Sequence, residues 1–190
     1  MNAAEHIVEA YYRLKKKCFT VTDIKVEHGN NRQIDLLAFD KASGECFHVE
    51  TSVTHRLNWR PSLEKIEKII GYKFFGIPKP NSKDAENGKD YYQNICKTYE
   101  LFGIKPKEVK RVICIWARKE SEEKVEEWLR SQEKKRDVSK DSISILLFRD
   151  DVLRELQNCI GTPHYEDEAL RILSLLEQFR KQTTSQDLQH

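Results

Sequence analysis

Three strand-like segments separated by two short turns constrain the fold of this chain more than any other feature. The segments "CFTVTDIKVEH" (18–28), "QIDLLAFD" (33–40) and "CFHVETSVTH" (46–55) are rich in β-branched and aromatic residues. The turns "GNNR" and "KASGE" separate them. Connections this short join antiparallel neighbours. Residues 18–55 therefore predict an antiparallel β-meander.

Helical and strand-like patterns alternate on either side of this meander. Helices are expected over 3–17, 62–76, 89–103, 121–136, 150–161 and 166–182, and further strands over 108–117 and 142–149. The order α β β β α α β α β α α predicts an α/β fold, a mixed β-sheet flanked by helices on both faces, whose later strands run parallel to a neighbour.

The length fits one domain, because 190 residues lie within the usual domain size. We expect a single domain over 1–182, with a core over about 3–117 and a C-terminal helix–strand–helices unit over 118–182. Residues 183–190 are expected to form a flexible tail.

Composition narrows the setting. No run of eighteen apolar residues and no secretory leader pattern is present, so we expect a cytoplasmic protein that does not enter a membrane. The five cysteines show no metal-type spacing and are expected to be free thiols in a reducing compartment. The formal charge of +2 is uneven, since residues 54–119 carry +8 (15 Lys/Arg against 7 Asp/Glu). Such a basic segment suits a phosphate-bearing partner, although solvated helix faces would give the same excess of positive charge.

Two carboxylates stand in strand-like surroundings. Strand alternation puts Asp35 on one face with Leu37, and Glu50 on one face with His48 and Ser52. If the hairpin aligns the two strands, both carboxylates point to the same side, near one end of the sheet. Converging carboxylates suit Mg²⁺ or Mn²⁺. The alternative is that each is an ordinary solvent-facing residue.

At this point the chain resembles the PD-(D/E)XK (restriction endonuclease-like) nuclease superfamily over residues 3 to about 76. Asp35 in "NRQIDLLAF" and Glu50 in "FHVETSV" match its metal-binding carboxylates, and Glu5 matches its first-helix glutamate. The resemblance implies divalent-metal binding by all three, through water for Glu5. Glu9, one turn further on, is the alternative helix carboxylate.

The family's E-x-K lysine is replaced here by Ser52, which therefore occupies a catalytic position of the pattern. That lysine orients or deprotonates water and offsets charge on the phosphate, tasks that a neutral hydroxyl cannot simply take over. From Glu50 to the strand end is about 13 Å, and a helix starting near Ser62 returns that far in about nine residues. The count ends near Lys73, on an apolar stripe of the helix. We predict Lys73 as the replacement cation; the alternative is that it reaches past the core to water.

The loop "THRLNWRPS" adds Arg56, Trp59 and Arg60 beside this site. Cations with an aromatic ring suit a nucleic-acid backbone and an unstacked base. The resemblance thus implies a Mg²⁺-dependent DNA endonuclease, a hydrolase with DNA or RNA as partner and a homodimer by fold analogy. Without the E-x-K lysine, the alternative is an inactive member of the fold that binds nucleic acid or acts as a protein-interaction subunit.

Overall fold

The protein is described here by a computed structural model that covers residues 1–54, 56, 59–160 and 165–187, with side chains as far as 181. The strands are β1 (Phe19–Lys25), β2 (Gln33–Phe39), β3 (Cys46–Ser52), β4 (Val109–Ile115) and β5 (Ile143–Leu147). The α-helices are α1 (Ala3–Ala10), α2 (Leu63–Phe74), α3 (Lys83–Glu86), α4 (Tyr92–Leu101), α5 (Glu122–Lys135), α6 (Arg154–Cys159) and α7 (Glu168–Asp187). Two π-helical segments are η1 (Tyr11–Lys15) and η2 (Phe148–Leu153).

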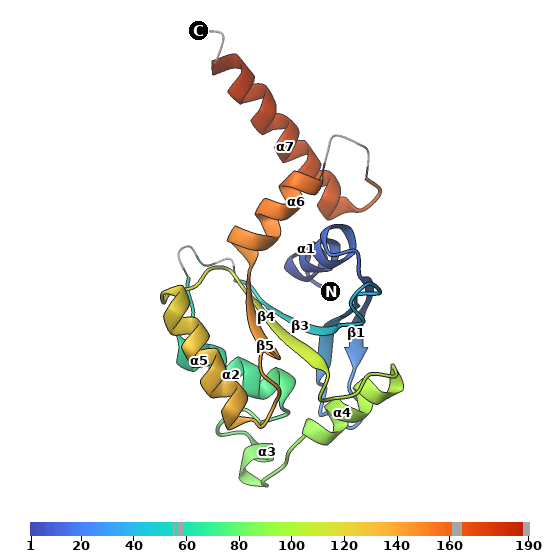
Figure 1. Cartoon of the computed structure of the whole chain (residues 1–190), viewed down its shortest axis with the longest axis vertical. Coiled ribbons are helices and arrows are strands. Elements are labelled where there is room, and N and C mark those ends of the chain that lie inside the picture. Colours follow the sequence, from blue (N-terminus) through green and yellow to red (C-terminus); the bar gives the residue numbers. More distant parts are fainter. Residues whose placement is uncertain (55, 57–58, 161–164, 188–190) are drawn as a thin grey trace.

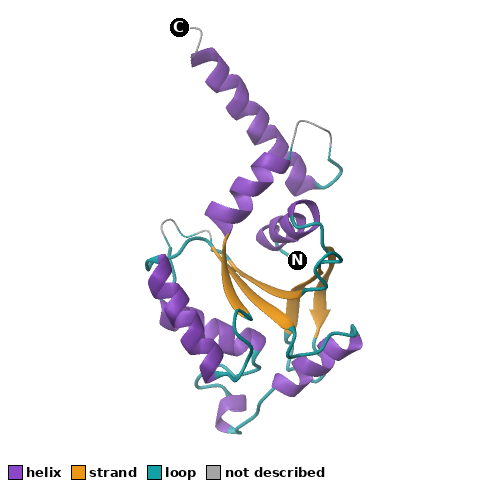
Figure 2. Ribbon diagram, in the orientation of Figure 1, coloured by secondary structure: helices purple, strands orange, loops and turns teal. Residues whose placement is uncertain are grey.

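The five strands form one mixed sheet in the order β1-β2-β3-β4-β5 (Figure 1). The pairs β1/β2 and β2/β3 are antiparallel, and the pairs β3/β4 and β4/β5 are parallel. Figure 2 shows helices on both sides of this sheet. The predicted α/β class, the antiparallel meander and the parallel later strands are therefore confirmed.

Turn chemistry fixes the register of the meander. Between β2 and β3, Asp40 accepts hydrogen bonds from the Ala42 amide and the Ser43 hydroxyl, both at 2.8 Å, and Gly44 takes a positive φ of 73°. Between β1 and β2, Asn30 and Asn31 take the left-handed conformation that asparagine tolerates. The resulting register sets the last residues of β2 beside the first residues of β3.

The core lies on both faces of the sheet. On one face, Leu36 and Val49 pack with Val112 against α1, η1, η2 and α6. On the other face, Ile113 and Ile115 pack against α2, whose buried residues are Ile66, Ile70, Gly71 and Phe74. Burying side chains of this size stabilises the fold by about 1.5–3 kcal/mol each. The packing of α2 on the sheet determines which of its other residues can approach β2 and β3.

Three details differ from the sequence prediction. The stretch over 77–88, expected to be a loop, contains the short helix α3, which Ser82 caps. The helix expected over 150–161 begins earlier, as η2, where Asp151 accepts a hydrogen bond from the Leu147 amide at 2.8 Å. The last helix is described as far as Asp187, so 183–187 are helical rather than tail-like, because no glycine or proline interrupts them. Residues 188–190 of the expected tail lie outside the described part of the chain.

Two further expectations concern cysteines and membranes. All five cysteines are free, and all are buried except Cys159. None of the helices in the described ranges is long and apolar enough to cross a bilayer.

Candidate functional site

Asp35 and Glu50 come together at the end of the β2/β3 pair. The strands are antiparallel and Leu36 pairs with Val49, so Asp35 and Glu50 occupy the next pair of opposite positions. The Thr51 amide donates a hydrogen bond to Asp35 Oδ2 at 2.8 Å, which ties the aspartate to the neighbouring strand. Both residues are buried, with exposed fractions of 8% for Asp35 and 0% for Glu50. The sequence left open the alternative that each carboxylate faces solvent, and the burial of both residues excludes it.

Lys73 lies between these two carboxylates. Its Nζ is 3.2 Å from Asp35 Oδ1 and 2.5 Å from Glu50 Oε2. Helix α2 begins after Ser62, whose hydroxyl accepts a hydrogen bond from the Lys65 amide, and Lys73 stands in its last turn beside the buried Phe74. Lys73 is therefore at the position that the residue count predicted. Its catalytic role stays a prediction.

His48 and Tyr99 form a hydrogen-bonded chain that ends at Glu50. His48 is fully buried on the same face of β3, and its Nε2 lies 2.8 Å from Glu50 Oε1. Its Nδ1 lies 2.5 Å from the hydroxyl of Tyr99 on α4. An ionised Glu50 requires Nε2–H to donate to the carboxylate and the Tyr99 hydroxyl to donate to Nδ1. This arrangement orients Glu50, leaving Oε2 toward Lys73.

Burial and charge perturb every titratable member of this cluster. Burial, reinforced by the charge of Glu50, raises the pKa of Asp35 to about 6. Burial also raises the pKa of Glu50. For Lys73, burial alone would lower the pKa, but the charges of Glu50 and Asp35 outweigh it and raise the pKa overall. Burial and the nearby Arg111 lower the pKa of His48 well below its usual range. At neutral pH, Lys73 is protonated and His48 is neutral.

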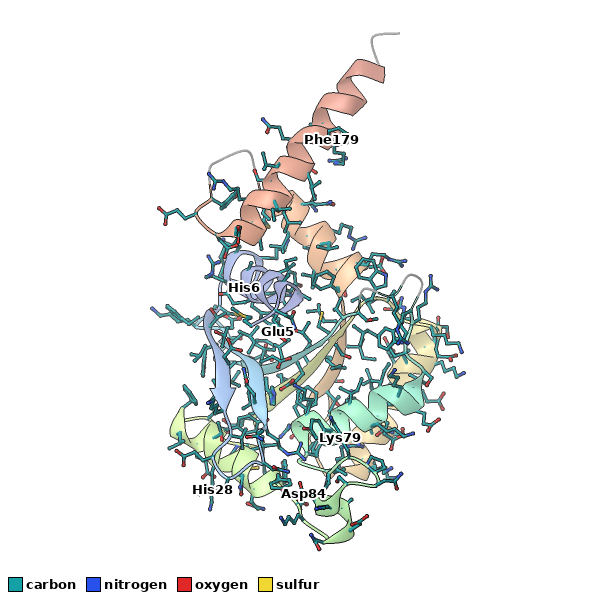
Figure 3. The ribbon with its side chains drawn as sticks, turned by 180° about the vertical axis from the view of Figure 1, so that it is seen from behind. Glu5, His6, His28, Lys79, Asp84 and Phe179 are labelled. Atoms are coloured by element: carbon teal, nitrogen blue, oxygen red, sulfur yellow. The ribbon has the colours of Figure 1, made fainter. Side chains whose placement is uncertain are left out.

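A polar cleft of about 470 Å³ opens in front of Asp35 and Lys73. Glu5 lines this cleft, and Figure 3 shows it on the side of α1 toward the sheet. The Glu5 carboxylate accepts hydrogen bonds from the backbone amide and side-chain amide of Asn2, which caps α1. Glu9 lies elsewhere, with its carboxylate bound to Arg13 at 3.0 Å and to Thr20 at 2.7 Å. Glu5 is thus the helix carboxylate that shares a cleft with Asp35.

Sequence reasoning missed Asp23, which also lines the polar cleft. Asp23 interrupts the β1/β2 ladder, since Thr22 pairs with Leu36 and Ile24 with Ile34. Its φ of 55° lies in the left-handed region, which is unusual within a strand. Its carboxylate pairs with the N-terminal amine at 3.2 Å. Strained residues of this kind concentrate at functional sites, but the sequence carries no signal for the strain.

Ser52 and the predicted nucleic-acid loop form a separate hollow at the end of β3. Ser52, Arg56, Trp59 and Lys65 line it. The Lys65 ammonium lies 4.8 Å from the centre of the Trp59 ring, and Arg56 and Arg60 are exposed. Residues 55, 57 and 58 of this loop lie outside the described part of the chain. The serine therefore faces a hollow with cations near an aromatic ring, on the same strand face as Glu50.

The donor set is small for a metal ion but fits Mg²⁺ or Mn²⁺. Within the described ranges, no group of three or more His, Cys, Asp or Glu side chains is placed to hold a metal. Mg²⁺ needs only one or two carboxylates, because it keeps several waters and takes the remaining oxygens from a phosphate. Glu50 Oε2 is buried, and its contact with Lys73 is an ion pair without hydrogen-bond geometry. Asp35 and Glu50 would be the residues that hold such an ion.

A scan against protein-family models and searches of curated proteins and of solved structures gave no significant match to the chain. The function must therefore be argued from the arrangement itself. Two carboxylates and a protonated lysine converge beside a polar cleft, which suits the binding and hydrolysis of an anionic substrate.

Proposed function

We propose that the chain is a metal-dependent nuclease that hydrolyses phosphodiester bonds in DNA, on the plan of the PD-(D/E)XK superfamily that its sequence resembles. The observation that carries the proposal is the Lys73 ammonium, 3.2 Å from Asp35 and 2.5 Å from Glu50. Two acids and a lysine at one point are the parts that this superfamily uses. Here the lysine comes from α2 instead of β3.

Each residue has a role in this proposal. A bound Mg²⁺ or Mn²⁺ would supply Lewis-acid chemistry, and Asp35 and Glu50 would hold it. Lys73 is protonated, so it cannot accept a proton from water. It instead donates hydrogen bonds and offsets the negative charge that grows on the phosphate during attack. Glu5 would bind ordered water at the mouth of the polar cleft. Ser52 is neutral, so in this proposal Lys73 supplies the positive charge.

The DNA partner is supported by cations beside the site. Arg56 and Arg60 are exposed at the end of β3, and Trp59 lies beside Lys65. Such a loop suits contacts with the phosphate backbone, whose strength falls with salt. The double variant Arg56→Ala/Arg60→Ala should weaken binding of DNA uniformly and lower the slope of log affinity against log salt by about 2.

The decisive experiment incubates purified protein with supercoiled plasmid, single-stranded DNA and RNA, each with Mg²⁺, Mn²⁺ or EDTA. We expect cleavage that requires the metal and is lost in Asp35→Ala. The control is Glu126→Gln, an exposed carboxylate on α5 that pairs with Arg130 and lines neither the polar cleft nor the hollow beside Ser52. Cleavage that survives Asp35→Ala, or that disappears equally in Glu126→Gln, would contradict the proposal.

One observation favours a second candidate, a member of the fold that binds nucleic acid without cutting it. Glu50 has no exposed surface, and His48 and Lys73 already contact its two oxygens. A metal ion must compete with the ammonium for Oε2. Salt-sensitive binding of nucleic acid without cleavage, in both Mg²⁺ and Mn²⁺, would support this candidate. If neither binding nor cleavage occurs, a protein-interaction subunit is favoured.

A further inference from the structure

A second, larger cleft adjoins the carboxylate site from the other side. It encloses about 840 Å³, within the range of about 300–1,000 Å³ typical of ligand clefts. Its walls are mostly apolar, and we call it the apolar cleft. Its principal apolar lining residues are Ile69, Ile77, Pro78, Pro80 and Ile113. Clefts of this kind beside titratable groups with perturbed pKa values are where ligands bind most often.

The polar and apolar clefts meet at Lys73. Tyr72 and Lys73 line both of them. Asp35 lines the polar cleft, whereas Glu50 and Ser52 line the apolar cleft. A phosphate held near Lys73 would therefore have polar surroundings on one side and apolar surroundings on the other. A nucleotide has the same division, since its phosphate is charged and the faces of its base are apolar.

The rim of the apolar cleft carries cations that suit the flanking phosphates. Lys65 and Lys79 are exposed beside the Trp59 and Tyr72 rings, whose centres lie 4.8 and 5.0 Å away. Arg136, by contrast, is half-buried over the Phe75 ring and is hydrogen-bonded to Gln132. Figure 3 shows Lys79 beside α2. The two other lysines of the rim, Lys68 and Lys135, are paired with Glu64 and Glu67. Cations on the rim and apolar side chains within the cleft match a nucleotide better than an uncharged ligand.

Close packing of one wall indicates that the cleft is preformed. The Ile77 amide donates to the Gly71 carbonyl at 3.0 Å, which fixes the segment after α2 against the helix. A β-carbon at Gly71 would lie 3.1 Å from Ile77 Cδ1, so glycine permits this approach. A preformed cleft spares the ligand part of the cost of ordering its site.

We propose that the apolar cleft receives one unpaired nucleobase next to the phosphate held at Lys73. The substrate would then be DNA with an unpaired nucleotide, such as a single strand or a bulge, rather than a uniform duplex. The position of the scissile phosphate rests on the proposed nuclease function. A paired base must first be unstacked, at a cost of a few kcal/mol, whereas a bulged base escapes most of it. Contacts with the aliphatic walls and with the Tyr72 ring would offset this cost. Stacking on an aromatic ring is worth about 1–3 kcal/mol per base.

Three duplex probes of identical flanking sequence test the proposal. One is fully paired, one has a single bulged thymine, and one has an abasic residue at the bulge. Affinities are measured by fluorescence anisotropy in EDTA, where no metal-dependent cleavage occurs. We expect the thymine bulge to bind about tenfold more tightly than the other two probes. Equal affinity for the thymine bulge and the abasic bulge would overturn the proposal.

Matched variants locate the effect. Ile77→Glu and Pro80→Glu place a carboxylate at exposed positions of the cleft and should each remove the preference for the thymine bulge. The control Leu101→Glu alters an apolar side chain on α4 that is 74% exposed, and should keep it. Thermal melting verifies that each variant is folded. If the preference persists in both folded cleft variants, the base does not bind there.

The two proposals fail in distinguishable ways. A bulge preference that depends on Ile77, in a protein that cleaves no substrate, would support the base site and refute the nuclease. Metal-dependent cleavage with no preference among the three probes would support the nuclease and refute the base site.

Discussion

Replacing Lys73 by methionine removes the ammonium and keeps most of the side-chain volume. In the wild-type protein, Lys73 Nζ is the ion-pair partner of both Asp35 and Glu50, and the exposed fractions of these side chains are 29%, 11% and 1%. Without the ammonium, two buried carboxylates would face each other unpaired. The variant therefore tests both the stability of the site and its chemistry.

The expected loss of stability depends on pH. Asp35 can avoid an unpaired charge by binding a proton. At about pH 8, two units above the Asp35 pKa of about 6, holding this proton makes the variant about 3 kcal/mol less stable than the wild type. The cost falls to nearly zero at about pH 6. Removal of one partner from a buried ion pair costs about 3–5 kcal/mol in general, which agrees.

The chemical effect is separate. Loss of a positive charge that stabilises the transition state lowers kcat by about 10²–10³-fold. On the proposed nuclease function, Lys73→Met should therefore cleave plasmid at least about a hundredfold more slowly than the wild type in Mg²⁺, at a temperature where it is fully folded.

Urea unfolding in EDTA at about pH 8 and pH 6 measures the stability, and plasmid nicking in Mg²⁺ measures the chemistry. Lys68→Met is the matched control, because Lys68 stands on the same helix but is 61% exposed and pairs with Glu64 at the surface. We expect its stability to change by less than about 0.5 kcal/mol. If Lys73→Met unfolds like Lys68→Met at both pH values, Lys73 does not neutralise the carboxylates. If it is folded and cleaves at the wild-type rate, Lys73 is not the missing cation.

Three other variants probe the same cluster. The folded Asp35 carboxyl holds its proton to about pH 6, whereas the unfolded one releases it near 3.8. Wild-type stability should therefore fall by about 3 kcal/mol as the pH rises through that interval. Asp35→Asn should lack this loss in urea titrations, and parallel curves would refute the raised pKa. His48→Gln should raise the Mg²⁺ concentration for half-maximal cleavage about tenfold, because it frees the Glu50 carboxylate that His48 orients; an unchanged requirement would assign His48 to packing alone. Ser52→Lys combined with Lys73→Met should recover part of the lost cleavage. No recovery would contradict the proposed likeness to the PD-(D/E)XK site, in which the lysine stands on the strand.

Much of the site could be predicted because it depends on local periodicity. Strand alternation and a short turn are enough to put Asp35 and Glu50 on one face, since register follows from turn length. The position of Lys73 followed from the rise per residue of a strand and of a helix. Both steps involve neighbouring elements, for which chain geometry leaves few alternatives.

The rest of the site depends on contacts that sequence spacing does not encode. Tyr99 lies 51 residues from His48 and reaches it only because α4 packs on that face of the sheet. Arg111 is fully buried beside His48 because β4 pairs in parallel with β3. Asp23 looks like an ordinary strand residue until its φ of 55° is known. Each of these depends on tertiary packing or on backbone strain.

The position of the lysine on α2 opposes the effect of burial on Glu50. Burial raises the pKa of this carboxyl, and the nearby Lys73 ammonium acts to lower it. A fully buried carboxylate without a partner would bind a proton, and a protonated Glu50 could not hold a divalent ion. Lys73 supplies the opposing charge at 2.5 Å, so the fold needs no bound cation to balance an ionised Glu50. Ser52 lines both the hollow that Arg56 and Trp59 line and the apolar cleft that Glu50 and Lys73 line. In the proposed nuclease, the small serine side chain would leave room for substrate in both spaces.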